Sequence, residues 1–100
     1  EGSGTEKPKK KLTLHTKNVS MGVRGTEFFS LFRPKEGESE IVVFSGNVEF
    51  RSRINKSDSA LVGPNQWGGL GGKYGKKIPN LVTLDESALQ KVRASLKIQD

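Results

Sequence analysis

The stretch Ile41-Val-Val-Phe-Ser-Gly-Asn-Val-Glu-Phe-Arg-Ser-Arg-Ile54 carries the strongest structural signal in the chain. Its first four residues are all apolar, which predicts a strand buried on both faces. Ser45-Gly46-Asn47 then supplies residues that a tight turn favours. Apolar and charged residues alternate beyond it, placing Val48, Phe50 and Ile54 on a buried face and Glu49, Arg51 and Arg53 in water. We therefore predict a β-hairpin here.

The residues before this stretch also favour β-structure. Residues 19–33 are rich in Val and Phe, and Gly22 and Gly25 interrupt them, which indicates a bulge or a close backbone approach. Pro and Gly at residues 34–38 predict a hairpin loop. Residues 11–16 alternate leucines with polar neighbours and predict a half-buried strand.

The residues after this stretch change in character. A polar turn at 55–59 leads into a short predicted strand at 60–62. Residues 63–75 are so rich in glycine that we predict a loop or irregular backbone, anchored by Trp67, Leu70 and Tyr74.

A short helix is predicted near the C-terminal end, at residues 84–96. Thr83 and Glu86 have the spacing of a capping box, and Leu89, Val92 and Leu96 fall on one helical face. Short strands at regular spacing need a second layer to cover their apolar faces. The predicted fold is mainly β: a small antiparallel two-sheet sandwich or β-roll with one short C-terminal helix, which plugs one end or covers an edge.

Composition sets further bounds. The 100 residues carry a net charge of +6 and no cysteine, which excludes disulfides, thiolate nucleophiles and cysteine-based zinc sites. Residues 1–11 have no apolar residue to bury and hold four of the lysines, so we predict a flexible basic linker followed by one domain at 12–100. The chain begins at Glu1 and has no initiator methionine, and we expect it to be a piece of a longer protein. No apolar run approaches the roughly 18 residues of a membrane span.

Groups for catalysis are few. The chain has one histidine and dispersed carboxylates, so we predict neither enzyme activity, nor a cofactor, nor a metal site. His15 falls on the polar side of its predicted strand, where a solvent-facing or hydrogen-bonded structural role is the simpler interpretation. The glycines around Trp67 do not form a phosphate loop, because Tyr74 stands where the dinucleotide motif needs Gly and where the other motif needs Ser or Thr.

Trp67 and Tyr74 have two interpretations. With Lys73, Lys76 and Lys77 nearby they could form a stacking platform with basic flanks for single-stranded nucleic acid. In an envelope protein the same rings could bind a sugar. The alternative is that Trp67 folds back as an anchor of the core, which we favour because a small domain generally buries its one tryptophan.

The segment Gly22-Val-Arg-Gly-Thr-Glu-Phe28 resembles the signature of the FecR family. Residues 43–50 are similar to the family's apolar strand, turn glycine and returning strand, and Gly63-Pro-Asn-Gln66 stands where the family tends to place a turn. The resemblance covers about residues 12 to 75. Thr16-Lys17-Asn18 departs from the family's usual Thr-Pro before the signature. Family domains usually have more β-structure ahead of it, which implies that the domain is cut off or shortened on its N-terminal side.

A physical role for the signature follows from its residues. Gly22 and Gly25 would permit a bulge or a positive φ beside Val23, and Phe28 would enter the core. Arg24 would pair with Glu27 or with backbone carbonyls, and its direct binding of a ligand carboxylate is the weaker alternative. On this interpretation Gly22, Val23, Gly25, Thr26, Glu27, Phe28 and Gly46 build the fold.

The resemblance implies a non-catalytic, periplasmic or cell-surface sensory and regulatory module that binds another bacterial envelope protein. FecR proteins sense an occupied transporter and control a sigma factor, and the resemblance implies only the extracytoplasmic half of such a protein. The candidate partner-binding residues are Trp67, Tyr74, Lys73 and Arg24. A glycan-binding or single-stranded nucleic-acid-binding module that uses Trp67 and Tyr74 is the alternative, although Glu36, Glu38, Glu40 and Glu49 count against a clean basic groove.

Overall fold

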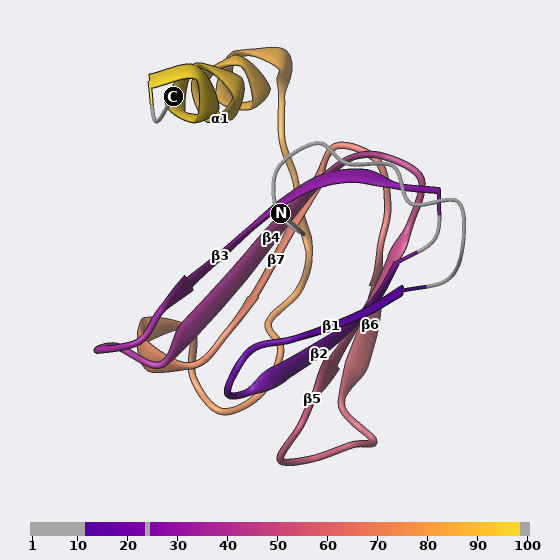
Figure 1. Ribbon diagram of the computed structural model, residues 1–100, viewed down its shortest axis with the longest axis vertical. Helices are drawn as coiled ribbons and strands as arrows, with labels where there is room; N and C mark the ends of the chain where they lie inside the picture. Colours follow the sequence, from indigo (N-terminus) through magenta and orange to yellow (C-terminus); the bar gives the residue numbers. More distant parts are fainter. Residues whose placement is uncertain (1–11, 24, 99–100) are drawn as a thin grey trace.

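The computed structural model describes residues 12–23 and 25–98 (Figure 1). The linker predicted at residues 1–11 lies outside the described residues. Two four-stranded antiparallel sheets and one C-terminal helix confirm the predicted fold class. The elements are β1 (Leu12–His15), β2 (Val19–Val23), β3 (Glu27–Arg33), β4 (Glu38–Ser45), β5 (Val48–Ser52), β6 (Ser59–Val62), β7 (Gln66–Leu70), the 3-10 helix η1 (Gly72–Tyr74), β8 (Val82–Thr83) and α1 (Glu86–Ile98).

The strand order shows how the two sheets are connected. One sheet has the order β1-β2-β5-β6 and the other β3-β4-β7-β8, and we call them the first and second sheets. The chain therefore crosses between sheets at β2–β3, at β4–β5 and at β6–β7. The predicted hairpin at 41–54 is wrong, because β4 pairs with β3 and β7 while β5 pairs with β2 and β6. Ser45-Gly46-Asn47 is a corner between sheets.

The main core fills the space between the sheets, and the alternation seen in the sequence places it there. Phe28, Ile41 and Val43 face it from the second sheet, and Met21, Val48 and Phe50 from the first. Ile54 was expected to join this core and does not, since 88% of it is exposed. The cause is Ser52, which ends β5: its hydroxyl accepts hydrogen bonds from the backbone N–H groups of Ile54 (3.2 Å) and Asn55 (3.0 Å), which turns the chain away.

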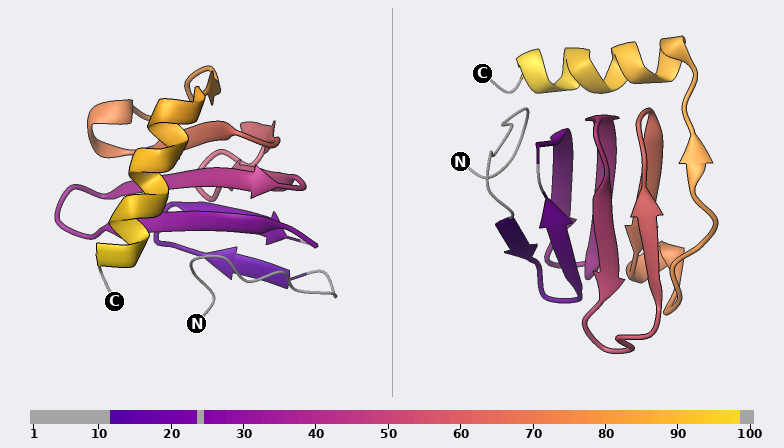
Figure 2. Two further views of the ribbon diagram at one scale, coloured as in Figure 1. Left: turned by 90° about the horizontal axis from the view of Figure 1, so that it is seen from above. Right: turned by 90° about the vertical axis from the view of Figure 1, so that its right-hand side faces the viewer.

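The helix α1 lies across the outer face of the second sheet, as Figure 2 shows from above. Leu89 packs there with Val42 and Phe44, and Phe29, Trp67, Leu84 and Val92 surround this second cluster. The expectation that the helix plugs an end or covers an edge is wrong, because the outer side of β4 is apolar and needs cover. The capping residue is Asp85 and not Thr83, since the Asp85 carboxylate accepts from the backbone N–H of Ala88 at 2.9 Å.

The glycine-rich segment contains a regular strand, so the predicted loop at 63–75 is wrong over residues 66–70. β7 lies between β4 and β8 in the second sheet, and Gly68 and Gly69 are buried. A Cβ on Gly68 would lie 3.2 Å from Val62 and 3.3 Å from Leu81. Glycine occurs in this strand because neighbouring side chains already fill the space. Local sequence alone shows only the low β-propensity of glycine.

Candidate functional site

The described residues of the signature build the corner where the chain passes between sheets. Val23, Thr26 and Phe28 are buried, and the Thr26 hydroxyl donates to the backbone carbonyl of Asn47 at 2.9 Å. This bond joins the β2–β3 crossing to the β4–β5 crossing. A Cβ on Gly46, whose φ is +86°, would lie 2.8 Å from the Thr26 hydroxyl oxygen. The hydrogen bond and the close approach of Gly46 to Thr26 therefore fix the two crossings relative to each other.

The glycines of the signature have different roles. Gly25 has a φ of +60°, as the proposed bend requires, whereas Gly22 sits in regular β2 opposite Thr13 and Glu49. The register shift occurs between Glu27 and Phe28. Arg24 lies outside the described residues, so its predicted contacts stay a prediction. Among the described contacts, the Glu27 carboxylate is 4.0 Å from the Arg93 guanidinium of α1.

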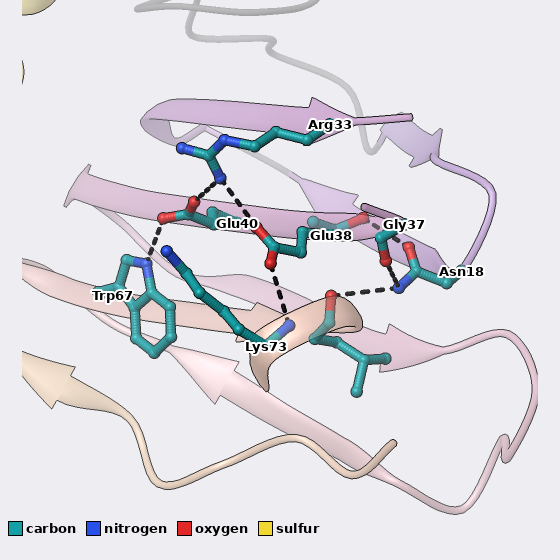
Figure 3. A network of polar contacts seen from close by, with 9 residues as sticks. Asn18, Arg33, Gly37, Glu38, Glu40, Trp67 and Lys73 are labelled. Carbon is teal, nitrogen blue, oxygen red and sulfur yellow. Dashed lines mark hydrogen bonds and ion pairs between the residues drawn. The ribbon is translucent and has the colours of Figure 1, made fainter. Parts of the chain in front are cut away.

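A polar network joins side chains of β3, β4 and β7 on the outer face of the second sheet (Figure 3). The Arg33 guanidinium at the end of β3 pairs with the carboxylates of Glu38, at 3.3 Å, and Glu40. The Glu40 carboxylate also accepts from the Trp67 indole N–H at 2.9 Å, and Glu38 accepts from the backbone N–H of Lys73 at 3.0 Å. One arginine thus holds two carboxylates that are largely removed from water.

The charges in this network shift each other's ionisation. Burial acts to raise the pKa of Glu40, but hydrogen bonds from Arg33, Trp67 and Tyr74 outweigh it and leave that pKa below its usual range. Burial raises the pKa of Tyr74, and the negative charge of Glu40 adds to the effect. The hydrogen bond to Glu40 raises the pKa of Arg33. Glu40 and Arg33 therefore stay charged at neutral pH, whereas the Tyr74 hydroxyl stays neutral.

Three of the predicted partner-binding residues are brought together beside this network. The Trp67 and Tyr74 rings meet edge to face, with centroids 5.0 Å apart and an angle of 66°, and the Lys73 ammonium is 5.4 Å from the Tyr74 centroid. Gly69 makes this packing possible, because a Cβ there would lie 2.5 Å from the Trp67 ring. Trp67 also joins the cluster under α1, so it serves as an anchor. We call Trp67, Tyr74 and Lys73 the aromatic patch.

The turns at one end of the sandwich line an open hollow of about 810 Å³. The Asn18 side-chain amide donates to the carbonyls of Gly37 (3.1 Å) and Leu70 (3.2 Å), which ties the first sheet to the second. Gly71 packs so closely that a Cβ would lie 2.0 Å from the Gly37 carbonyl. The exposed lysines that line the hollow are Lys17, Lys35 and Lys76.

Sequence reasoning missed the polar half of this region. Glu38 and Glu40 were expected only to count against a basic groove, and neither Arg33 nor Asn18 was identified as a contact. One signal was present: two carboxylates two residues apart in a strand face the same side, and an arginine lies across the hairpin. His15 is exposed, as expected. Within residues 12–23 and 25–98, no group of three or more His, Cys, Asp or Glu could hold a metal ion.

Fold and site together define a small two-sheet β domain with a covering helix. The family model described as FecR protein matches residues 3–49, which span β1 to β4, the start of β5, the signature and the corner at Gly46. The resemblance to the FecR family is thereby confirmed over this part of the chain. The similarities noted from residue 50 to 75 lie outside the match. Neither the search of curated proteins nor the search of solved structures found a match.

Proposed function

We propose that this chain is a non-catalytic, extracytoplasmic regulatory module that binds another protein of the cell envelope. The match to the FecR family, a signalling and regulatory family associated with the periplasmic side of the membrane, supports the regulatory role and the location. In the part of the chain that the structure describes, no helix is long and apolar enough to span a membrane. Capture from envelope extract would identify the partner.

The observation that carries the proposal is the open edge of β3. Among the described residues, β3 pairs only with β4, so one side of a seven-residue strand has no neighbour. The other edge strands are shorter: β1 and β6 have four residues each, and β8 has two. Unpaired N–H and C=O groups on an edge strand accept an added strand from a partner. The half-buried Phe29, Leu31 and Phe32 add apolar contact area.

Side chains beside this edge would give selectivity. Arg33 ends β3, and the network connects it through Glu40 to the aromatic patch on the same face. Tyr74 is half-buried and Lys73 is exposed. If a partner strand is added along β3, these two residues can contact the side chains of that strand but not its backbone. On this view the backbone of β3 provides affinity and the aromatic patch distinguishes partners. Arg24, which precedes β3 by three residues in the sequence, is a further proposed contact.

Hydrogen exchange on a complex tests the proposal directly. A partner is first captured from envelope extract after nuclease digestion and a high-salt wash, which removes proteins held through nucleic acid. Amide exchange is then measured on the chain alone and with the purified partner. Backbone amides alternate in direction along a strand, so every second amide of β3 should become protected. Protection confined to β1, β6 or β8 would refute the β3 edge as the contact.

Two variants distinguish a contact at the aromatic patch from an effect of net charge. Lys73→Glu with Tyr74→Ala should weaken partner binding by about fivefold or more, since charge and ring are both lost at the contact. Lys91→Glu makes a comparable charge change on an exposed residue of α1 and should leave binding unchanged. Equal effects of the two would show that net charge, and not the aromatic patch, governs binding. Glycan or single-stranded nucleic-acid binding through Trp67 and Tyr74 stays a prediction, and recovery of nucleic acid alone would favour it.

A further inference from the structure

A second hollow lies on the opposite side of the molecule, on the outer face of the first sheet. Its volume is about 490 Å³, and its lining residues are all polar: His15, Ser20, Arg51, Ser52, Arg53 and Lys56. Three of them carry a fixed positive charge and none is a carboxylate. The helix covers the other sheet, so among the described elements no helix packs over this face (Figure 2).

The strand register explains why these side chains gather. Ser20 of β2 lies opposite His15 of β1 on one side and opposite Arg51 of β5 on the other. Residues that face each other across antiparallel strands project from the same face. The neighbours Met21 and Phe50 are buried in the main core, so this row points outward. The small Ser20 between two long side chains leaves the space that forms the hollow.

The two guanidinium groups are held in place by the protein. Arg51 donates to the backbone carbonyl of Lys56 at 2.7 Å and also pairs with the Glu49 carboxylate. Arg53 donates to the backbone carbonyl of Thr16 at 2.8 Å. These contacts leave N–H donors on both guanidinium groups for a ligand. Donors that are already fixed lose little conformational freedom when an anion binds.

We propose that this hollow, the basic hollow, binds the phosphate group of an organic phosphomonoester. Arg51 lies in β5, Arg53 directly follows that strand and Lys56 lies in the turn beyond it. Together they suit a tetrahedral dianion with several oxygens better than a planar carboxylate with two. Glu49 offsets one of the three charges, and the two that remain match a dianion. The hollow is larger than a phosphate ion, so part of an attached organic group fits as well. The site is independent of the β3 edge.

Nuclear magnetic resonance of the folded chain with phenyl phosphate as the probe tests this site. Phenyl phosphate should shift the amide signals of residues 15, 20, 51–53 and 56 and leave those of β3, β7 and α1 in place. Benzyl alcohol, which lacks the phosphate, should produce no shifts at these residues. Shifts spread over all exposed lysines would overturn the proposal, because they would indicate binding to net charge alone.

Paired variants separate a built site from general attraction. Arg51→Gln with Arg53→Gln should weaken phenyl phosphate binding by about tenfold or more. Lys77→Gln with Lys91→Gln removes the same net charge outside the hollow and should change affinity by less than about twofold. Equal weakening by both pairs would overturn the proposal. If the arginine variant loses its dispersed spectrum, Lys56→Gln replaces it, because this change removes no described contact of the Lys56 ammonium and should leave the fold intact. Lys56→Gln should weaken phenyl phosphate binding by about threefold.

The phosphate can belong to a soluble compound or to a lipid headgroup, and vesicles distinguish the two sources. If the chain sediments with phosphatidylcholine vesicles that contain phosphatidic acid, and the arginine variant does not, the phosphate belongs to a lipid headgroup. Phenyl phosphate binding without such sedimentation assigns it to a soluble organic phosphate. Binding to neither overturns the proposal and leaves the protein-binding function untouched, because partner capture and β3 protection are measured on the other sheet.

Discussion

Replacing Gly46 by alanine should destabilise the domain more than the same change at Gly25, although both residues have a positive φ. At Gly25 a Cβ meets nothing within 4 Å, so the cost is left-handed strain of about 1–2 kcal/mol, partly offset by a stiffer unfolded chain. At Gly46 the φ is +86° and the Cβ would lie 2.8 Å from the Thr26 hydroxyl oxygen and 3.1 Å from the Gly25 carbonyl oxygen. Overpacking of this kind adds about 1–3 kcal/mol.

Urea unfolding measures the difference. With a slope of about 1 kcal/mol/M for a domain of this size, Gly46→Ala should lower the midpoint by about 1–3 M more than Gly25→Ala. In a Thr26→Ala background the closest contact is gone, so the extra cost of Gly46→Ala should fall by about half or more. Equal midpoints for the two glycine variants would refute the account of the corner, and so would a Gly46→Ala cost that Thr26→Ala leaves unchanged.

Three further changes test other parts of the structure. The pKa of Glu40 is lower in the folded than in the unfolded chain, so its ionised carboxylate stabilises the fold above the ordinary pKa of 4.5, and this contribution is lost as pH falls through the folded pKa. Glu40→Gln should therefore make the urea midpoint depend less on pH between about pH 6 and pH 3. Gly69→Ala should displace the Trp67 ring, seen as a red shift of the single tryptophan's emission, and an unshifted spectrum would contradict the close packing. Leu89→Ala should cost about 2–4 kcal/mol in the cluster under α1, against less than about 0.5 kcal/mol for exposed Lys91→Ala.

Most elements of this fold could be predicted from local sequence because each has its own periodicity, but β7 and β8 could not. The apolar run at 41–44 is buried on both faces because the main core lies on one side and α1 on the other. The alternation of Val48 and Phe50 correctly predicts a half-buried strand. Strand partners were harder to predict. A glycine with positive φ serves a hairpin and a corner between sheets equally well, and an inward-facing strand keeps its alternation in either sheet.

The candidate site was only partly predictable for a related reason. Lys73 and Tyr74 lie close to Trp67 in the sequence, so their proximity in space could be expected. The pairing of Glu40 with Arg33 and Trp67 depends on β4 lying between β3 and β7, which no local pattern shows. The basic hollow likewise requires β1, β2 and β5 to be neighbours.

The residues covered by the family match show which features of this chain lie in the part that resembles FecR proteins and which lie outside it. Residues 3–49 include the corner at Thr26 and Gly46 and the whole of β3, so the proposed contact edge lies within the FecR match. Arg51, Arg53, Lys56 and the aromatic patch lie beyond the match. The resemblance therefore lends no support to the basic hollow or to Trp67 as a partner contact. Both depend on the contacts described above, and each experiment must succeed without the other.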